Sequence, residues 1–352
     1  MTEPTEMLFI ATPLETEYVD RIKAAAGDRI RVVYDADLMP PTRFVADHGG
    51  MPGFRRNEEQ ASRWAKHLAA ATILFDMPPG IPAGSGLLDV APNVKWVQTS
   101  SSGIGQALKR LGLIGTSVHV TNARGIHAEP LAEFAFASIL KHVKRLDFLR
   151  DEQAAHRWER YCGDGLDGTS LLVVGAGAVG SRVGRLGQAF GMTVAAVVNS
   201  PSPERKAELN AHSIHGVQEL HGLLSTADFV VLCVPHTPDT EQLINAKAIA
   251  AMKPGVVLVN IARGQVIDEE AMIGALRSGH IAFAGLDVAA IEPLPVESPL
   301  WDMPNVLISP HSASTVTSEN RRITDIFCAN IPLYLDGRLA DMKNVFDKDR
   351  MY

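Results

Sequence analysis

The chain has 352 residues, of which 46% are hydrophobic and 21% are charged, enough to build the cores of two domains of ordinary size. This composition excludes a disordered protein and a fibrous one. The formal net charge of −7 provides no basic surface for nucleic acid or for an anionic membrane. We therefore expect small molecules as partners.

The cysteines predict neither a disulfide framework nor a metal site. Cys162, Cys233 and Cys328 are far apart and form no Cys-x-x-Cys pair. The first six residues are acidic where a signal peptide would be basic, and the most apolar stretches fall short of the roughly 18 residues of a membrane helix. We expect a cytoplasmic protein without a bound metal.

The first third of the chain alternates short apolar runs with helical patterns. Helices are predicted at 15–26 and 58–71, and strands at 8–11, 30–34, 72–75, 94–97 and 118–120. Strands that alternate with helices are typical of a parallel sheet covered on both faces. The first domain is therefore predicted to be α/β.

A second α/β alternation follows a long helical pattern at 130–150, which Pro130 suits as a first turn. Six apolar runs then predict strands at 171–175, 194–199, 229–235, 256–261, 281–287 and 306–309. Their order with intervening helices favours a second doubly wound sheet. A final helix at 317–335 has no strand after it, and we expect it to pack back across the junction of the domains.

The glycine pattern Gly175-Ala-Gly-Ala-Val-Gly180 lies between a predicted strand and a predicted helix. In that context the glycines allow a tight turn and a close approach of backbone to a pyrophosphate, which the helix N-terminus attracts. The sequence therefore predicts a dinucleotide site here.

The residue expected to contact the adenosine ribose is Asn199 instead of the usual Asp or Glu. Without that carboxylate a ribose 2′-phosphate is not repelled, and Ser200, Ser202, Arg205 or Lys206 could bind it. NADP is therefore slightly favoured over NAD, although asparagine also suits a plain ribose.

Further motifs occur in a fixed order at 121–133 (TNARGIHAEPLAE), 227–240 (ADFVVLCVPHTPDT), 259–268 (VNIARGQVID), 285–295 (GLDVAAIEPLP) and 309–314 (SPHSAS). Together they resemble the D-isomer-specific 2-hydroxyacid dehydrogenase family, and the similarity extends over residues 95–337. The N-terminal third resembles the family only in its α/β pattern. The resemblance implies hydride transfer between NAD(P)H and a 2-oxoacid.

The resemblance assigns the catalytic arginine, carboxylate and histidine to Arg263, Glu292 and His311. Each residue type also suits the chemistry. An arginine can hold the carboxylate of a 2-oxoacid with two parallel N–H bonds. A histidine can give a proton to the developing alkoxide, and a carboxylate at its other nitrogen would fix the ring.

The resemblance also implies binding roles. Asp287 would bind the nicotinamide carboxamide, and the loop of Ser101, Ser102 and Gly103 would hold the substrate carboxylate. The remaining predicted coenzyme contacts are Gly175, Gly177, Ala178, Val179, Gly180, Asn199, Ser200, Pro235, Thr240 and Ala262. His236, where the family often has an aliphatic residue, is either a coenzyme contact or a neutral variant. His212, His215 and His221 are interpreted as parts of a solvated segment between a helix and a strand.

We predict two doubly wound parallel-sheet domains with the active site in the cleft between them. A flavodoxin-like substrate domain comprises residues 1–122 and 312–352, and a Rossmann domain comprises residues 123–311. The predicted enzyme is a D-2-hydroxyacid dehydrogenase or 2-ketoacid reductase, of which a glyoxylate/hydroxypyruvate reductase is one form. The resemblance also implies a homodimer, with residues 129–150 as part of its interface.

Three alternatives stay open at this point. A formate-oxidising relative is disfavoured because that branch has Gln where this chain has Glu292. A phosphite-oxidising relative shares Arg, Glu and His with this chain. A redox-sensing corepressor would bind the dinucleotide without turnover.

Overall fold

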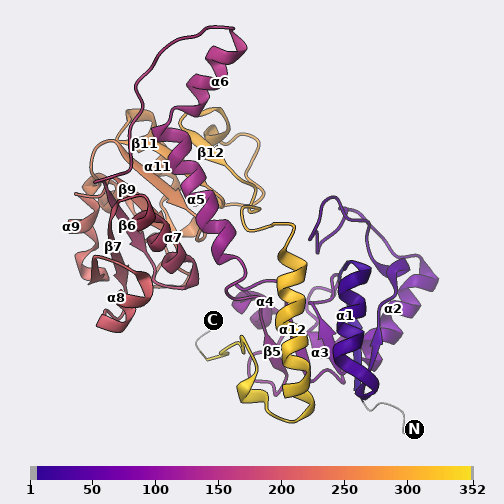
Figure 1. Cartoon of the computed structure of the whole chain (residues 1–352). Helices are drawn as coiled ribbons and strands as arrows, with labels where there is room; N and C mark the ends of the chain where they lie inside the picture. The colour runs from indigo at the N-terminus through magenta and orange to yellow at the C-terminus, as the bar shows by residue number, and fades with distance from the viewer. Residues whose placement is uncertain (1–5, 350–352) are drawn as a thin grey trace. The chain divides into compact units, whose positions relative to one another are not determined.

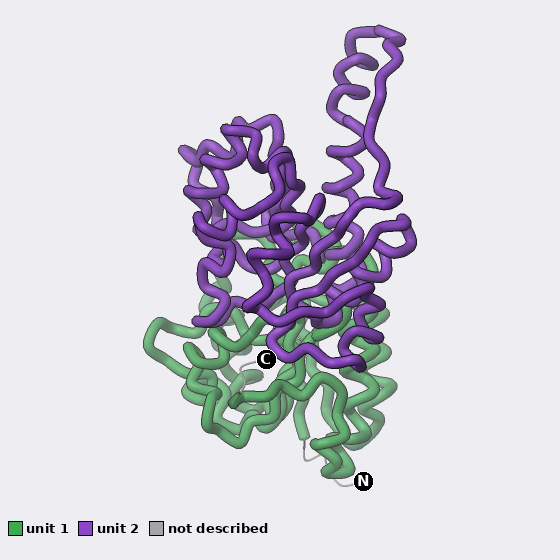
Figure 2. Tube along the Cα trace, turned by 90° about the vertical axis from the view of Figure 1, so that its left-hand side faces the viewer, with its two compact units in different colours: residues 1–126, 315–352 green, residues 127–314 purple. Residues whose placement is uncertain are grey.

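The computed structural model describes residues 6–349, which form two compact units (Figure 2). Unit 1 combines residues 1–126 with 315–352, and unit 2 comprises residues 127–314. The acidic residues before Glu6 lie outside the described part. Each unit has a parallel sheet with helices on both faces, so the predicted fold class is confirmed.

Unit 1 contains a five-stranded parallel sheet in the order β2-β1-β3-β4-β5, the flavodoxin-like order. Each strand lies where an apolar run predicted it, with ends shifted by one or two residues. The strands are β1 (Glu6–Ile10), β2 (Ile30–Val33), β3 (Ile73–Phe75), β4 (Trp96–Gln98) and β5 (His119–Thr121).

Two clusters of apolar side chains cover the faces of this sheet, because successive residues of a strand point to opposite sides. Leu8 of β1 packs with Phe327 beneath α1 and α12, whereas Phe9 packs with Trp64 beneath α2. The helices of unit 1 are α1 (Thr16–Ala26), α2 (Glu58–Ala70), α3 (Leu87–Val90), α4 (Gly105–Arg110) and α12 (Glu319–Leu335). The final helix therefore completes the core of unit 1 beside α1 (Figure 1).

Unit 2 contains a seven-stranded parallel sheet in the order β12-β11-β10-β9-β6-β7-β8. Counted from β6, this is the Rossmann order 3-2-1-4-5-6 with one further strand. The strands are β6 (Ser170–Val174), β7 (Thr193–Val198), β8 (Ser213–Gly216), β9 (Phe229–Leu232), β10 (Val256–Asn260), β11 (Ile281–Leu286) and β12 (Val306–Ile308).

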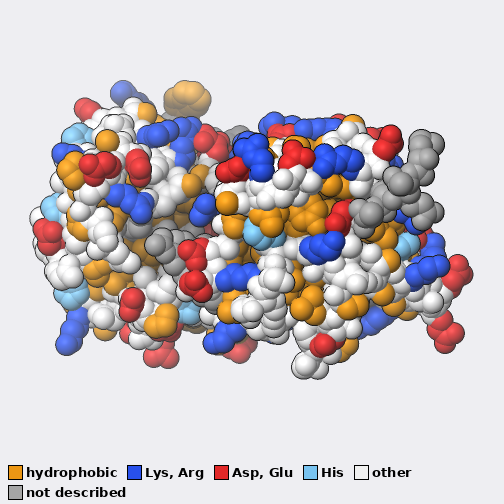
Figure 3. Space-filling view, turned by 90° about the horizontal axis from the view of Figure 1, so that it is seen from below, with side chains coloured by type: hydrophobic (Ala, Val, Ile, Leu, Met, Phe, Trp, Pro, Cys, Tyr) orange, Lys and Arg blue, Asp and Glu red, His pale blue; other side chains and the backbone are white. Residues whose placement is uncertain are grey.

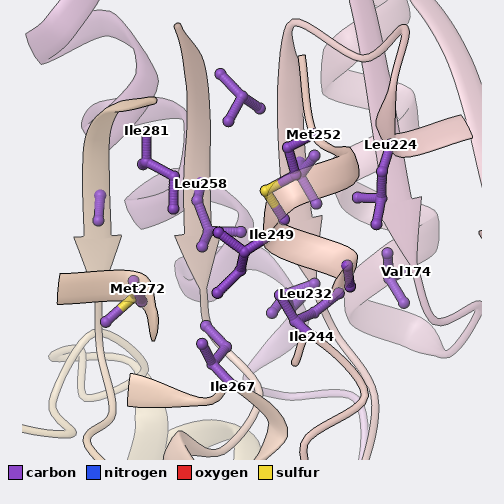
Figure 4. Packing of buried hydrophobic residues seen from close by; sticks show 14 of the residues in the cluster. Val174, Leu224, Leu232, Ile244, Ile249, Met252, Leu258, Ile267, Met272 and Ile281 are labelled. Carbon is purple, nitrogen blue, oxygen red and sulfur yellow. The ribbon is translucent and has the colours of Figure 1, made fainter. Parts of the chain in front are cut away.

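The core of unit 2 also has two layers. The helices are α5 (Ala128–Val143), α6 (Leu146–Ala154), α7 (Ala178–Ala189), α8 (Pro203–Leu209), α9 (Leu220–Leu224), α10 (Ala246–Ala251) and α11 (Glu269–Ser278). One face of the sheet packs against α5, α7 and α8, and the other against α9, α10 and α11. Figure 4 shows the second layer, in which Ile249 and Met252 lie against Leu258 of β10.

Two sequence predictions are wrong. The segment around His212 and His215 is not simply a solvated connection, because residues 213–216 form the edge strand β8, paired with β7. The helix predicted at 130–150 is two helices. The chain changes direction at Arg145, which has a left-handed backbone conformation with φ 51° and separates α5 from α6. Figure 1 shows α6 and the chain returning from it standing away from the sheet of unit 2.

Charged side chains of both signs are interspersed on the face drawn in Figure 3, with apolar ones between them. On this face the side chains of one sign do not gather into a single large area. Among residues 6–349, none of the helices has the length and apolarity needed to cross a bilayer.

Candidate active site

The glycine segment leads directly from β6 into α7, as the sequence predicts. A Cβ at Gly180 would lie 2.0 Å from the carbonyl oxygen of Gly175, so only glycine lets the helix start this close to the turn. Gly177 is the N-cap residue, Ala178 and Val179 open the first turn, and no side chain caps it. The first N–H groups of α7 are therefore available to an anion.

The two residues after β7 are uncharged, and the first charged side chains are Glu204 and Arg205 in the first turn of α8. Asn199 and Ser200 follow the strand and are exposed. Ser202 caps α8 by accepting a hydrogen bond from the Arg205 N–H at 3.2 Å. The guanidinium of Arg205 donates to the carbonyl oxygen of Ala176 at 3.2 Å, which brings its charge to the glycine segment.

The loop after β9 is a compact turn. The Thr240 hydroxyl donates to the Pro235 carbonyl oxygen at 2.7 Å and accepts from the Thr237 N–H at 2.8 Å, so these predicted coenzyme contacts lie together. His236 pairs with Glu241. Burial raises the pKa of the Cys233 thiol to about 12, so this neighbour of the glycine segment stays neutral.

Arg263 lies on the turn that follows β10. The side chain of the buried Asn260 stabilises this turn with two hydrogen bonds. The Asn260 amide donates to the Arg263 carbonyl oxygen, and its Oδ1 accepts from the Ala262 N–H, each at 3.0 Å. The Arg263 guanidinium donates to the Ala262 carbonyl oxygen at 2.6 Å. It forms no ion pair with any residue of 6–349, so its charge is not used structurally.

Glu292 and His311 form a hydrogen-bonded pair. The Nδ1 atom of His311 lies 2.8 Å from Oε2 of Glu292, whose Oε1 accepts from the Ala289 N–H at 3.1 Å. Nε2 of His311 makes no hydrogen bond within the described part of the chain. Both side chains are partly exposed. The pair therefore presents Nε2 to solvent.

Asp287 is 2% exposed and holds the turn that carries His311. Its Oδ1 accepts from the Ser309 hydroxyl at 2.7 Å and from the N–H groups of Ser312 and Ala313, each at 2.9 Å. Its carbonyl oxygen accepts from the His311 N–H at 2.8 Å. Within residues 6–349, Oδ2 has no hydrogen-bond partner and is available to a further donor.

The loops that carry Arg263 and Glu292 touch each other. A Cβ at Gly264 would lie 2.0 Å from the backbone of Ala289, so the two chains meet there. Gln265 donates to the Ala290 carbonyl oxygen at 2.9 Å, and the Ala290 N–H donates to Glu269 at 3.0 Å. The sequence analysis missed these supporting residues and Asn260, although a polar residue ending the apolar run of β10 was a visible signal.

The predicted substrate loop belongs to unit 1 and follows β4. The Ser101 carbonyl oxygen accepts from the Thr99 hydroxyl at 2.8 Å, and that of Ser102 accepts from the Asn122 amide at 3.3 Å. The N–H groups of Ser101, Ser102 and Gly103 have no hydrogen-bond partner among residues 6–349. These N–H groups are therefore available to bind an anion.

The side chains of His212 and His215 form hydrogen bonds with neighbouring residues. Nδ1 of His215 lies 2.8 Å from Glu219 and its Nε2 lies 2.9 Å from Ser213, while His212 accepts from the Val194 N–H at 3.0 Å. Residues 6–349 contain no group of three or more His, Cys, Asp or Glu side chains placed to hold a metal ion.

The chain is similar to one family of known proteins. Residues 136–313 match the model of the NAD-binding domain of D-isomer specific 2-hydroxyacid dehydrogenases. D-3-phosphoglycerate dehydrogenase of Mycobacterium leprae is 36% identical over 247 residues, which cover 67% of this chain and 46% of that relative. The chain thus spans about half the length of this relative. Glyoxylate reductase of Korarchaeum cryptofilum is 30% identical over 269 residues, 73% of this chain and 78% of the relative.

Solved structures match over nearly the whole chain. A D-isomer specific 2-hydroxyacid dehydrogenase family protein of Aeromonas salmonicida has a TM-score of 0.78 at 26% identity, covering 98% of this chain and 99% of that one. A D-isomer specific 2-hydroxyacid dehydrogenase of Xanthobacter autotrophicus, solved with NADPH and MES, has a TM-score of 0.74 at 28% identity, covering 99% of both chains.

Proposed function

Because the chain belongs to the D-isomer-specific 2-hydroxyacid dehydrogenase family, we propose that it transfers a hydride between NAD(P)H and a 2-oxoacid to give a D-2-hydroxy acid. The observation that carries this proposal is the hydrogen bond between His311 and Glu292. The buried Asp287 holds the turn on which His311 lies. The D configuration rests on the family alone.

The residues of unit 2 fit a nicotinamide dinucleotide. The uncapped first turn of α7 suits the pyrophosphate, and a Cβ at Gly177 would meet no atom within 4 Å, so that side of the turn is open to a ligand. The unpaired Oδ2 of Asp287 can accept a hydrogen bond from the carboxamide. When bound, the reduced coenzyme supplies the hydride. Unit 2 is accordingly proposed as the coenzyme domain and unit 1 as the substrate domain.

Arg263, His311 and Glu292 have different proposed roles in binding the substrate and transferring the proton. Arg263, which forms no ion pair within residues 6–349, binds the substrate carboxylate and polarises the neighbouring carbonyl group. His311 gives the proton at Nε2 to the alkoxide oxygen that forms as hydride reaches C2, and Glu292 holds the ring through Nδ1. One proton and one hydride thus convert the 2-oxoacid to the 2-hydroxy acid.

The loop of Ser101, Ser102 and Gly103 is proposed as a second contact to the substrate carboxylate. Its N–H groups, which have no hydrogen-bond partner among residues 6–349, support this role. The carbonyl groups of the same loop accept hydrogen bonds from Thr99 and Asn122. Glyoxylate is one candidate substrate, because the Korarchaeum relative is a glyoxylate reductase.

NADPH is the proposed coenzyme, slightly favoured over NADH. Arg205 supports this choice because its guanidinium lies against the glycine segment, where a 2′-phosphate beside Asn199 would meet a cation. The Xanthobacter relative was solved with NADPH, which agrees with this proposal.

A homodimer is proposed, with the segment 129–150 and the projecting arm of residues 146–161 as interface. No residue of α6 is buried, and Trp158 is 98% exposed. Leu146 and Leu149 are also exposed, so the arm presents apolar surface that a second copy could cover. A reducing compartment, the cytoplasm, is proposed because Cys162, Cys233 and Cys328 are all free.

Initial rates of NADPH and NADH oxidation with 2-oxoacids from glyoxylate to phenylpyruvate test the proposal, with His311→Ala as the control. We expect turnover that requires His311, and rates that rank the substrates. Tight dinucleotide binding without turnover of any acceptor would contradict it and favour a redox sensor.

A further inference from the structure

Ser100 is the residue at which the chain leaves β4 and turns into the loop of Ser101, Ser102 and Gly103. It is 7% exposed, and one side chain binds both of its donors. Oδ1 of Asp76 accepts from the Ser100 N–H at 3.1 Å, and Oδ2 accepts from the Ser100 hydroxyl at 2.7 Å. The carboxylate of Asp76 therefore fixes both the backbone and the side chain of Ser100.

Asp76 is itself held in an uncommon conformation. Its φ is 70°, in the left-handed region, and it directly follows β3. Its N–H donates to the Gln98 carbonyl oxygen at 2.7 Å, and its Oδ1 also accepts from the Met77 N–H at 2.9 Å. Aspartate and asparagine tolerate this region better than most residues. The turn after β3 thus aims this side chain at the turn after β4.

We infer that Asp76 is a positioning residue for the substrate carboxylate, an inference that rests on the proposed function. By fixing Ser100, Asp76 sets the direction in which the next three N–H groups point. Thr99 and Asn122 hold the carbonyl groups of the same loop, so the free N–H groups have one preferred orientation. Asp76 does not touch the substrate in this scheme.

The negative charge of Asp76 is not what the loop needs. A carboxylate beside a site for an anion is electrostatically unfavourable, whereas its hydrogen bonds organise the loop. Asparagine can keep those bonds, because Oδ1 still accepts from two N–H groups and the amide can donate to the Ser100 oxygen. Charge and geometry can therefore be separated by substitution.

The test compares Asp76→Ala, Asp76→Gly and Asp76→Asn by steady-state kinetics. We expect the KM for the 2-oxoacid to rise about tenfold in the Ala and Gly variants, because the N–H groups lose their fixed direction. The kcat and the Kd for NADPH should stay within about twofold. Asp76→Asn should restore a KM at or below that of the original chain.

Two controls separate positioning from folding. Both variants lose the same side-chain hydrogen bonds, but glycine relieves the left-handed backbone of residue 76, so the Gly variant should lose less of its thermal midpoint than the Ala variant while its KM rises equally. Asp89→Ala removes a similar contact in unit 1, the 2.8 Å hydrogen bond from the Gly86 N–H, and should leave the KM unchanged.

Calorimetric titration of the enzyme–NADPH complex with oxamate, an analogue that is not reduced, provides a readout without turnover. Its Kd should follow the KM across the variants. An unchanged KM and oxamate Kd in Asp76→Ala would overturn the inference, as would equal losses in the Asn and Ala variants. Absence of any 2-oxoacid turnover by the original chain would instead contradict the proposed function.

Discussion

The imidazole of His311 and the carboxylate of Glu292 meet at 2.8 Å through Nδ1 and Oε2, although 18 residues separate them in the chain. The other oxygen of Glu292 is held by the Ala289 N–H, and the backbone of His311 is held by the carbonyl oxygen of Asp287. Both partners are therefore fixed before any substrate binds. Fixed donors need no reorganisation during reaction.

Replacing Glu292 by Gln should lower kcat for 2-oxoacid reduction about 10- to 100-fold, because the ring loses the charge that stabilises its protonated form. The Kd for NADPH should not change. The measurement is kcat at saturating substrate, with Glu297→Gln on the same loop as the control. Equal kcat values in the two variants would remove Glu292 from the proposed proton relay.

Arg263→Ala should raise the KM for 2-oxoacids about 100-fold, because two charge-assisted hydrogen bonds to the carboxylate are lost. Coenzyme affinity, measured by NADPH fluorescence titration, should remain within about twofold. Arg277→Ala, on the exposed last turn of α11, is the matched control. A variant that loses coenzyme binding instead would show that Arg263 has a different role.

Arg205→Glu should reverse the coenzyme preference, because a carboxylate at the glycine segment repels a 2′-phosphate. We expect the ratio of kcat/KM for NADPH to that for NADH to fall at least about tenfold. Arg185→Glu, exposed on α7, controls for net charge. If the original chain binds NADH more tightly than NADPH, the proposed preference is wrong.

Asp47→Asn should destabilise unit 1 in a pH-dependent manner. The hydrogen bonds from Arg43 lower the pKa of Asp47 to about 2, with help from the Gly50 N–H. A lowered folded-state pKa adds stability above the ordinary value near 4, on the order of 2 kcal/mol, which is lost as the pH falls towards 2.

The thermal midpoint of Asp47→Asn should therefore lie below that of the original chain at pH 7, and the difference should narrow by about half at pH 3. Asp28→Asn, in the exposed turn of residues 27–29 after α1, should match the original chain at both pH values. A difference independent of pH would mean that the ionised carboxylate is not the stabilising group.

Trp158→Glu should convert the proposed dimer to monomers, because it places a charge in the apolar interface of the arm. Light scattering after size exclusion should report half the original mass. Ile114→Glu, which changes a partly exposed apolar residue of unit 1, should not alter the mass. An original chain that is already monomeric at working concentration would contradict the dimer.

The sequence predicted most of the fold because the buried strands of a parallel sheet are continuous apolar runs. It missed β8 because Ser213-Ile-His-Gly216 is an edge strand of mixed polarity, only partly buried. It also missed the break at Arg145, where no Gly or Pro marks the left-handed residue that separates α5 from α6.

The sequence predicted the candidate site residues largely through motifs, but it did not predict the hydrogen bonds that hold them. Asp287 is predicted to bind the carboxamide, and its Oδ1 also accepts hydrogen bonds from Ser309, Ser312 and Ala313, which the sequence did not predict. Oδ2 is the oxygen left for that predicted role. Such contacts between distant segments depend on the sheet order, which local patterns do not specify.

The contact of Gly264 with the backbone of Ala289 has a consequence for redesign. Because the two loops meet without side chains between them, a shift of the turn that carries Arg263 would also shift the loop of Glu292, the proposed partner of His311. Any larger residue at 264 would displace both at once. Attempts to broaden the range of acceptors of the proposed enzyme should therefore keep Gly264 and vary the loops at the carboxyl edge of the five-stranded sheet, which do not include the proposed proton-transfer residues.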